Sequence, residues 1–332
     1  MGKSSTKSLK AALKSQQSRF KSKEKQTHAA QIADQKSKAK KSGQKPKKPI
    51  TDVDDKGKGK GKATPQKITV PFAVTDSILL IGEGNFSFAH ALVYDPPHQL
   101  EHFPPVNLTA TAYDTEEECY EKYPESEAIV SRLRGKGVRV IFAVDATKLE
   151  RHAALKGKQW DKIVWNFPHA GKGIADQDRN ILSNQVLILD FLRSAAHLLA
   201  RGPIPLAKST RKKKSEDDDE DDTPDNDATA HDDDERTPAR SRGTVLITLR
   251  NVKPYTLWDV PLLAKKPPPP TGSTPPNPHY MVVRSFAFHR EAWKGYEHRM
   301  TKGERAHGNG TTGEGGEDRT WEFCIGRVNA AQ

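Results

Sequence analysis

Cysteine, long apolar runs and aromatic residues are scarce in this sequence. Two cysteines, Cys119 and Cys324, are too few for a disulfide framework or a multi-cysteine zinc site, so we expect a reducing compartment and no metal. No stretch approaches the roughly 18 consecutive apolar residues of a membrane span, and the N-terminus lacks the apolar run of a signal peptide. These absences argue against a disulfide-stapled secreted domain and predict no membrane partner.

The charge of the chain is large but unevenly distributed. Over 332 residues the net charge is +11, yet residues 1–67 hold 20 Lys/Arg against 5 Asp/Glu, whereas residues 208–242 hold 8 against 13. The rest of the chain is close to neutral. Hydrophobic residues make up only 34% of the sequence, which is little apolar surface for a chain folded throughout. The basic character therefore belongs to a tail and not to the folded part.

Four segments are predicted to lie outside the folded core. Residues 1–67 have almost no large apolar side chains and are expected to form a disordered basic tail, which solubilises the chain, directs nuclear import with loose RNA contact, or does both. Residues 208–242 change from basic to acidic and are interpreted as a disordered charged insertion in a surface loop. Residues 265–278 are a Pro-rich loop and 302–319 a Gly-rich one. These segments interrupt or precede one domain, residues 68–332.

Within this domain, strand-like and helix-like segments alternate. Apolar or β-branched runs typical of buried strands are followed by segments with helical spacing, which indicates a parallel sheet with helices on both faces. Two further strand-like runs are expected to pair as a closing hairpin. The predicted strands cover residues 77–81, 107–113, 138–144, 160–165, 243–249, 280–289 and 320–325. The pattern predicts an α/β fold with a mostly parallel seven-stranded sheet and one antiparallel strand, as in class I (Rossmann-like) methyltransferases.

The first strand runs into a glycine-containing turn, GEGNFSF. Gly82 and Gly84 lie where strand gives way to helix, a place where glycine permits positive φ angles and a close approach of a ligand to the backbone. Ser87 stands where the dinucleotide fingerprint has its third glycine. The turn is therefore either a cofactor-binding loop or a tight structural turn.

Aspartates end the next two predicted strands. Asp114 follows the second strand, where an acidic side chain can accept hydrogen bonds from a ribose diol, although it lies 30 residues after Gly84 instead of about 20. Asp145 follows the third strand and by the same geometry can reach an adenine amino group. Each aspartate can instead cap the helix that follows it. Asp114 is the stronger candidate for a ligand contact.

The fourth predicted strand ends in the string NFPHAGKG. Asn166 can hydrogen-bond the edge of a planar nitrogenous ring, and Phe167 can stack on a base. Pro168 fixes the direction of the loop, and His169 can relay a proton near neutral pH. The alternative is a strand-to-helix loop without chemistry. The combination with the glycine turn and Asp114 favours a functional site.

These strings resemble the eukaryotic 25S rRNA (uridine-N3)-methyltransferase family, which has a Rossmann-like methyltransferase domain. The resemblance rests on LIGEGNFSF, on AYD and VDATKL at strand ends, and above all on WNFPHAGKG followed by DRNILSNQVLILDFLRSA. It covers residues 68–207 and 243–300, including WKGYEHRMT at 293–301, but neither the tail nor the acidic insertion.

The resemblance implies S-adenosylmethionine as methyl donor and N3 of a uridine in large-subunit rRNA as acceptor. It also implies a set of site residues. The cofactor loop would comprise Gly82, Glu83, Gly84, Asn85, Phe86 and Ser87, with Asp114 on the ribose and Asp145 on the adenine. The target base would face Asn166, Phe167, Pro168 and His169, a string that looks like a variant of the Asn-Pro-Pro-Tyr motif of nitrogen methyltransferases. Tyr296 and Arg299 are candidate RNA contacts in the WKGYEHRMT string.

The chemistry requires that the proton on uracil N3 leave. We expect His169 as the general base and Asn166 as a donor to the anionic ring oxygens, with the uridine unpaired or flipped out. The sequence thus predicts an enzyme that acts as a monomer on rRNA or a pre-ribosomal particle in the nucleus and nucleolus. Two other interpretations stay open. One is a non-catalytic Rossmann-fold factor that binds RNA during ribosome assembly, and the other is a nicotinamide-dependent oxidoreductase, which the missing third glycine disfavours.

Overall fold

A computed structural model of the chain describes residues 68–205, 241–269, 275–299 and 316–326, together with residues 11, 14, 15 and 18. The predicted basic tail and the charged insertion fall almost entirely outside these residues, as do parts of the Pro-rich and Gly-rich loops. Their predicted disorder therefore stays a prediction.

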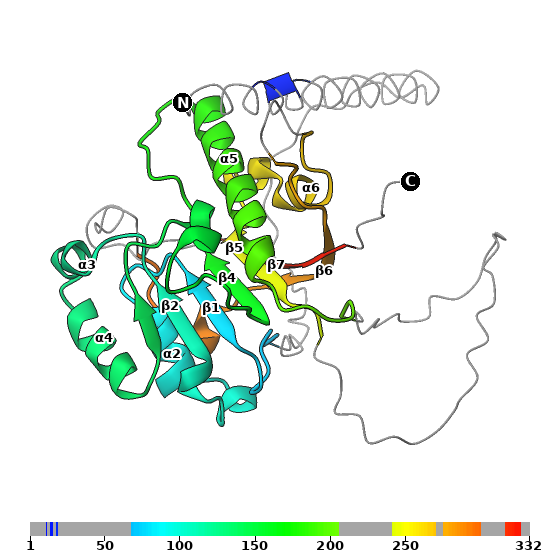
Figure 1. Ribbon diagram of the computed structural model, residues 1–332. Coiled ribbons are helices and arrows are strands. Elements are labelled where there is room, and N and C mark those ends of the chain that lie inside the picture. The colour runs from blue at the N-terminus through cyan, green and yellow to red at the C-terminus, as the bar shows by residue number, and fades with distance from the viewer. Residues whose placement is uncertain are drawn as a thin grey trace, which may run out of the picture.

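Seven strands form one sheet in the order β3-β2-β1-β4-β5-β7-β6 (Figure 1). Neighbours among β1 to β5 pair in parallel, and β7 is antiparallel to both β5 and β6. The predicted seven strands, the closing hairpin and the single antiparallel strand are confirmed, and the sheet is mixed. Its strands are β1 (Ile78–Ile81), β2 (Leu108–Thr111), β3 (Arg139–Ile141), β4 (Lys162–Asn166), β5 (Thr244–Arg250), β6 (Tyr280–Ala287) and β7 (Asp318–Ile325).

Helices cover both faces of the sheet (Figure 1). One face carries α2 (Ser87–Tyr94), α3 (Glu116–Lys122) and α4 (Ser126–Gly135), and the other carries α5 (Gln177–Ala195) and α6 (Val260–Lys265). Short 3-10 helices cover His98–Leu100, Pro105–Asn107, Ala146–Arg151, Ala196–Leu198, Tyr255–Trp258 and Arg290–Ala292. In the described part of the chain, no helix is both long and apolar enough to cross a membrane.

The residues of β1 alternate between two hydrophobic cores. Ile78 and Leu80 pack into the core that holds α2 and α4, whereas Leu79 and Ile81 pack into the core that holds α5 and α6. Successive side chains of a strand point to opposite faces, so a strand covered on both sides must be apolar at every position. This explains the continuous apolar run that predicted the strand.

The helical segments follow the sequence pattern with one addition. Two helices flank Pro124, because α3 ends at Lys122 and α4 begins at Ser126. Helix α6 is an element that the pattern did not reveal, since it has only six residues and carries a proline in its first turn. It packs against α5 and leaves the carboxyl edge of the sheet open.

Glu322 joins the β6–β7 hairpin to the parallel part of the sheet. Its buried carboxylate accepts hydrogen bonds from Lys162 Nζ on β4 (2.6 Å), Thr244 Oγ1 on β5 (2.7 Å) and Arg284 Nε on β6 (2.6 Å). Burial alone would raise the pKa of this carboxyl, but the charges of Lys162 and Arg284 hold the pKa of Glu322 below its ordinary value. The carboxylate therefore stays ionised and fixes the lateral order of four strands.

The hairpin determines where the C-terminal part of the domain goes. Because β6 and β5 are both antiparallel to β7, β6 runs parallel to β5 and ends at the same edge of the sheet. Beyond β6, the rings of Phe288, Trp293 and Tyr296 pack around Phe88 of α2, with centroid distances of 6.2, 4.9 and 5.4 Å. These contacts hold residues 288–299 against the carboxyl ends of the parallel strands.

Candidate active site

A cavity of about 450 Å³ opens at the carboxyl ends of β1 to β4. Its walls come from the glycine turn after β1, the ends of β2, β3 and β4, helix α5 and residues 296–299. All predicted site residues except Phe86 line it: Gly82, Glu83, Gly84, Asn85, Ser87, Asp114, Asp145, Asn166, Phe167, Pro168, His169, Tyr296 and Arg299. The structure thus brings together residues that are spread over more than 200 positions of the sequence.

The glycine turn needs its glycines for two different reasons. Gly82 has a φ of +64°, and a Cβ atom there would lie 2.9 Å from Trp165 Nε1. At Gly84 a Cβ atom would lie 3.2 Å from the Cβ of Arg299. A side chain at either position would push against the opposite wall of the cavity. The turn therefore exposes backbone, not side chain, to whatever the cavity binds.

Phe86 is the residue that departs from the expected cofactor loop. Its side chain is fully buried and packs edge-on against Phe142, at a centroid distance of 5.3 Å. Its backbone has a φ of +61° and forms the N-cap of α2. Phe86 therefore shapes the turn from the core side, and its ring does not face the cavity.

Glu83 is a carboxylate at the N-terminus of α2. Its Oε2 accepts a hydrogen bond from the N–H of Ala89 (3.2 Å). Burial nevertheless raises the pKa of Glu83 to about 7, because the helix N–H groups compensate only part of the desolvation cost. Among the described residues, no Lys or Arg contributes to the pKa of this carboxyl. A cationic ligand would supply the missing countercharge.

The two strand-end aspartates differ in their local partners. Asp114 Oδ1 pairs with Lys122 Nζ at 2.6 Å, while Thr115 and not Asp114 caps α3. Asp145 does cap the 3-10 helix after it, because its Oδ1 accepts the N–H of Thr147 (2.9 Å). The capping alternative is thus wrong for Asp114 and confirmed for Asp145. Both side chains line the cavity, and their contacts with ribose and adenine stay predictions.

Residues 296–299 are attached to the glycine turn from the other end of the domain. Ser87 Oγ donates to the backbone oxygen of Glu297 and accepts its N–H, both at 3.0 Å. Arg299 pairs with Glu125 at 2.6 Å and with Glu297 at 2.8 Å. Glu125 also accepts a hydrogen bond from Asn85 Nδ2 (3.1 Å). The two chain segments therefore form one continuous wall.

Three polar atoms of residues that line the cavity are buried without a hydrogen-bond partner among the described residues. They are Asn166 Oδ1, Ser183 Oγ and Arg299 Nε. Leaving a buried polar group unpaired costs about 1–3 kcal/mol, so each of these atoms calls for a polar partner. The set contains an acceptor, a donor and a hydroxyl that can act as either. A planar ring with both donors and acceptors on its edge fits this chemistry.

Phe167 follows Asn166 in a strained backbone conformation. Its φ is +52°, in the left-handed region that non-glycine residues rarely adopt. Its ring packs on His298 with a centroid distance of 4.4 Å. Burial, together with the charges of Arg290 and Arg250, lowers the pKa of His298 to about 4. His298 is therefore neutral near pH 7 and packs as an apolar ring beside Phe167.

His169 lies exposed at the mouth of the cavity. Its Nδ1 accepts a hydrogen bond from the N–H of Gly171 (2.9 Å), and partial burial lowers its pKa. The ring is therefore neutral at pH 7 with its proton on Nε2. The lone pair that a general base needs is occupied by Gly171. In this arrangement His169 presents an N–H donor on Nε2, and its role as general base stays a prediction.

Sequence reasoning missed Ser183, Glu125 and Asp190, although Ser183 and Asp190 line the cavity and Glu125 ties two of its walls together. Ser183 and Asp190 lie on α5, where a polar residue between apolar ones looks like a solvent-facing position. Burial raises the pKa of Asp190, while its ion pair with Arg193 (2.6 Å) opposes that change. No sequence signal distinguishes these residues from ordinary surface positions.

The chain was then compared with known proteins. Residues 79–300 match the family described as rRNA (uridine-N3-)-methyltransferase BTM5-like, which is more than half of the chain. The chain is 30% identical over 262 residues to the 25S rRNA (uridine(2634)-N(3))-methyltransferase of Saccharomyces cerevisiae, covering 71% of this chain and 69% of that protein.

Two further relatives are matched over smaller shares of their own lengths. The heavy metal-associated isoprenylated plant protein 41 of Arabidopsis thaliana is 23% identical over 260 residues, which is 77% of this chain but 38% of the plant protein. The ferredoxin-fold anticodon-binding domain-containing protein 1 homolog of Mus musculus is 36% identical over 126 residues, covering 37% of this chain and 18% of the mouse protein. The match over residues 79–300 and the similarity to the yeast enzyme, which spans two thirds of both chains, show that the chain belongs to the rRNA (uridine-N3-)-methyltransferase family.

Proposed function

We propose that the cavity binds S-adenosylmethionine together with a uridine of large-subunit rRNA, and that the enzyme transfers the methyl group to N3 of that uridine. Family membership supplies the reaction, and the strand order with a single antiparallel strand fits a class I methyltransferase. The observation that carries the proposal is the position of Asn166, which lines the same cavity as the glycine turn and whose buried Oδ1 has no hydrogen-bond partner among the described residues.

The cofactor half of the cavity fits a cationic nucleoside. S-adenosylmethionine supplies a methyl group on a positively charged sulfur. The backbone of Gly82 to Gly84 can approach such a ligand closely, and Glu83 provides a carboxylate without a cation of its own. Asp114 and Asp145 are placed to accept hydrogen bonds from ribose and adenine groups.

The target half of the cavity fits the pairing edge of uracil. That edge presents N3–H between two carbonyl oxygens, which calls for one acceptor flanked by donors. Asn166 Oδ1 is the acceptor, and Arg299 Nε and His169 Nε2 are the donors. Asn166 orients N3 through its proton, and the donors stabilise the charge that develops on the ring oxygens. Because the Asn166 amide cannot take up a proton, the N3 proton passes to solvent water. The N3–methyl bond would then form as the sulfur–methyl bond breaks, which would leave S-adenosylhomocysteine as the neutral leaving group.

The substrate in the cell and the place of action are further parts of the proposal. The rRNA substrate, alone or in a pre-ribosomal particle, puts the enzyme in the nucleus and nucleolus, where it acts as a monomer. The basic tail adds a sequence-independent attraction for RNA phosphates and the nuclear address. The folded domain then recognises one uridine by the shape of its cavity.

We predict that Asn166→Ala abolishes most methyl transfer without loss of cofactor binding. Removing one group that stabilises the transition state typically lowers turnover by about 100-fold or more. The measurement is mass spectrometry of rRNA nucleosides from cells that lack the chain and carry either the wild type or the variant. Wild type should restore N3-methyluridine and Asn166→Ala should not. Unchanged N3-methyluridine in cells without the chain would refute the proposed reaction.

Two variants of His169 distinguish a donor from a base. His169→Gln keeps an N–H donor and should retain turnover within about tenfold, whereas His169→Ala should lose more. A general base would make both variants equally inactive, since an amide cannot take up a proton. The readout is single-turnover methylation of an rRNA fragment at saturating cofactor. Equal loss in both variants would restore the general-base interpretation.

The pH dependence of cofactor binding should report on Glu83. With its pKa near 7, Glu83 is mostly protonated at pH 6 and mostly ionised at pH 8, and a cation binds the ionised form better. Affinity for S-adenosylmethionine should therefore rise with pH, by up to about tenfold over this range. Calorimetry on Glu83→Gln should show no such rise, while Glu121→Gln, exposed on α3, should behave as wild type. A rise that survives in Glu83→Gln would assign the titration to another group.

Removal of residues 1–67 tests the role assigned to the tail. This segment carries 20 Lys/Arg against 5 Asp/Glu. The truncated chain should bind RNA more weakly and with a flatter salt dependence, because each lost phosphate contact reduces the log–log slope by about 0.7 for single strands. Its affinity for S-adenosylmethionine should not change. A salt slope equal to that of the full chain would place the electrostatic contacts on the folded domain, and nuclear retention of a tagged truncated chain would overturn the targeting role.

A further inference from the structure

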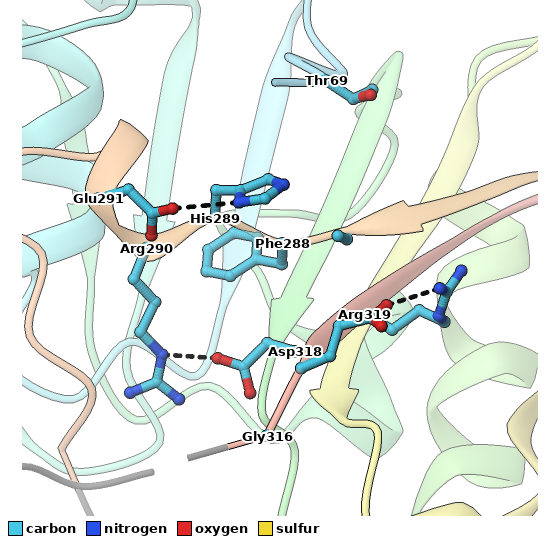
Figure 2. Close-up of a pocket in the computed structure, with 10 residues that line it drawn as sticks. Thr69, Phe288, His289, Arg290, Glu291, Gly316, Asp318 and Arg319 are labelled. Carbon is cyan, nitrogen blue, oxygen red and sulfur yellow. Dashed lines mark hydrogen bonds and ion pairs between the residues drawn. The ribbon is translucent and has the colours of Figure 1, made fainter. Parts of the chain in front are cut away.

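Arg290 connects the active-site cavity with a second groove on the same edge of the sheet. The groove has a volume of about 790 Å³ and is lined by Thr69, by residues 287–291 after β6 and by residues 316–319 at the start of β7 (Figure 2). It shares no lining residue with the active-site cavity. Arg290 lines the groove, and its guanidinium carbon lies 4.8 Å from the ring centroid of Phe167, which lines the cavity. The stacked pair is therefore the partition between the two spaces.

Asp318 fixes the position of this partition. Arg290 Nε donates a hydrogen bond to Asp318 Oδ2 at 2.7 Å, and Figure 2 shows the two groups facing each other across the groove floor. The Asp318 side chain is only 8% exposed. Its backbone oxygen accepts the N–H of Phe288 (2.7 Å), and the Phe288 ring packs edge-on against Phe167 at 6.0 Å. Asp318 thus holds two of the neighbours of the Phe167 ring.

Phe167 requires this support because its own backbone is strained. A non-glycine residue at a φ of +52° costs about 1–2 kcal/mol relative to an ordinary conformation. The Phe167 N–H donates to the backbone oxygen of Thr248 (2.8 Å), which fixes one end of the turn. The contacts of the Phe167 ring fix the other end of the turn. Without these contacts Phe167 can relax to an ordinary backbone conformation, and its neighbours Asn166 and Pro168 would move with it.

We propose that Asp318 and Arg290 are positioning residues for methyl transfer, which hold Phe167 so that the Asn166–His169 loop presents Asn166 to the target base. The inference rests on the proposed function, because the loop faces the uridine only if that proposal is correct. The planar guanidinium stacks on the ring face, and the carboxylate keeps it in that plane. Neither residue lines the active-site cavity, so both act through Phe167.

The test compares Arg290→Met, Asp318→Asn and Phe167→Ala in the full chain. Each variant should lower kcat for methylation of an rRNA fragment about tenfold or more, because a small misplacement of a reacting group strongly lowers the rate. The Kd for S-adenosylmethionine should stay within about twofold of the wild-type value. In the Phe167→Ala background, Arg290→Met should cause no further loss, since both substitutions remove the same contact. If Asp318→Asn does not fold, Arg290→Lys replaces it: this variant keeps the cation but not the planar stacking group and should show an intermediate loss.

The matched control is Arg319→Met. Arg319 lines the same groove (Figure 2) and pairs with Glu317 at 2.6 Å, whereas the cation over the Phe167 ring is Arg290. It should leave kcat unchanged. Full kcat in Arg290→Met, multiplicative losses with Phe167→Ala, or an equal loss in Arg319→Met would each overturn the inference. A wild-type chain that fails to methylate rRNA would instead refute the proposed function, so the two failures are distinguishable.

Discussion

The position of β7 between β5 and β6 is the constraint on which the site depends. Because β7 is antiparallel to both of its neighbours, β6 runs parallel to β5, ends at the same edge as the parallel strands and delivers residues 288–299 to the cavity. Glu322 secures this insertion, because it binds groups from β4, β5 and β6 at once. Compared with apolar packing, a buried carboxylate paired with two cations adds little to the free energy of unfolding. Removing one of its partners, however, would strongly destabilise the fold. The network thus specifies strand order more than it adds stability.

The carboxyl edge concentrates backbone strain around the cavity. Phe86, Ala143 and Phe167 follow β1, β3 and β4, respectively, and all have φ between +52° and +61°. Each such residue costs about 1–2 kcal/mol, which the surrounding core must offset. The Phe86 ring is fully buried and the Phe167 ring is held by three neighbours. The apolar cores therefore do more than fold the sheet: they force the strand-end turns into shapes that expose backbone and polar atoms to a ligand.

Local patterns in the sequence predicted the strands and the strings that line the cavity. They failed where a partner lies far along the chain. Ser87 meets Glu297 across 210 residues, and nothing near either residue indicates the contact. Phe86 is a second example. Its place in the glycine turn suggests a ligand contact, but in the fold its ring packs against the distant Phe142. His169 shows a third kind of limit: its residue type suggested a base, but the sequence does not show that its Nδ1 accepts the N–H of Gly171, and its role as a base stays a prediction.

Under the proposed function, the charges of the cavity explain how a nearly neutral domain would select a base and a cationic cofactor. The target end holds two neutral histidines and an arginine already paired with Glu125 and Glu297, so it offers hydrogen bonds without excess positive charge. Such a site discriminates a base by its pairing edge, because a mismatched edge leaves buried atoms unpaired. The cofactor end holds Glu83, whose charge a cationic donor would match. A strongly basic cavity would bind any phosphate and repel that donor. Placing the positive charge in the tail therefore leaves the cavity selective for both ligands.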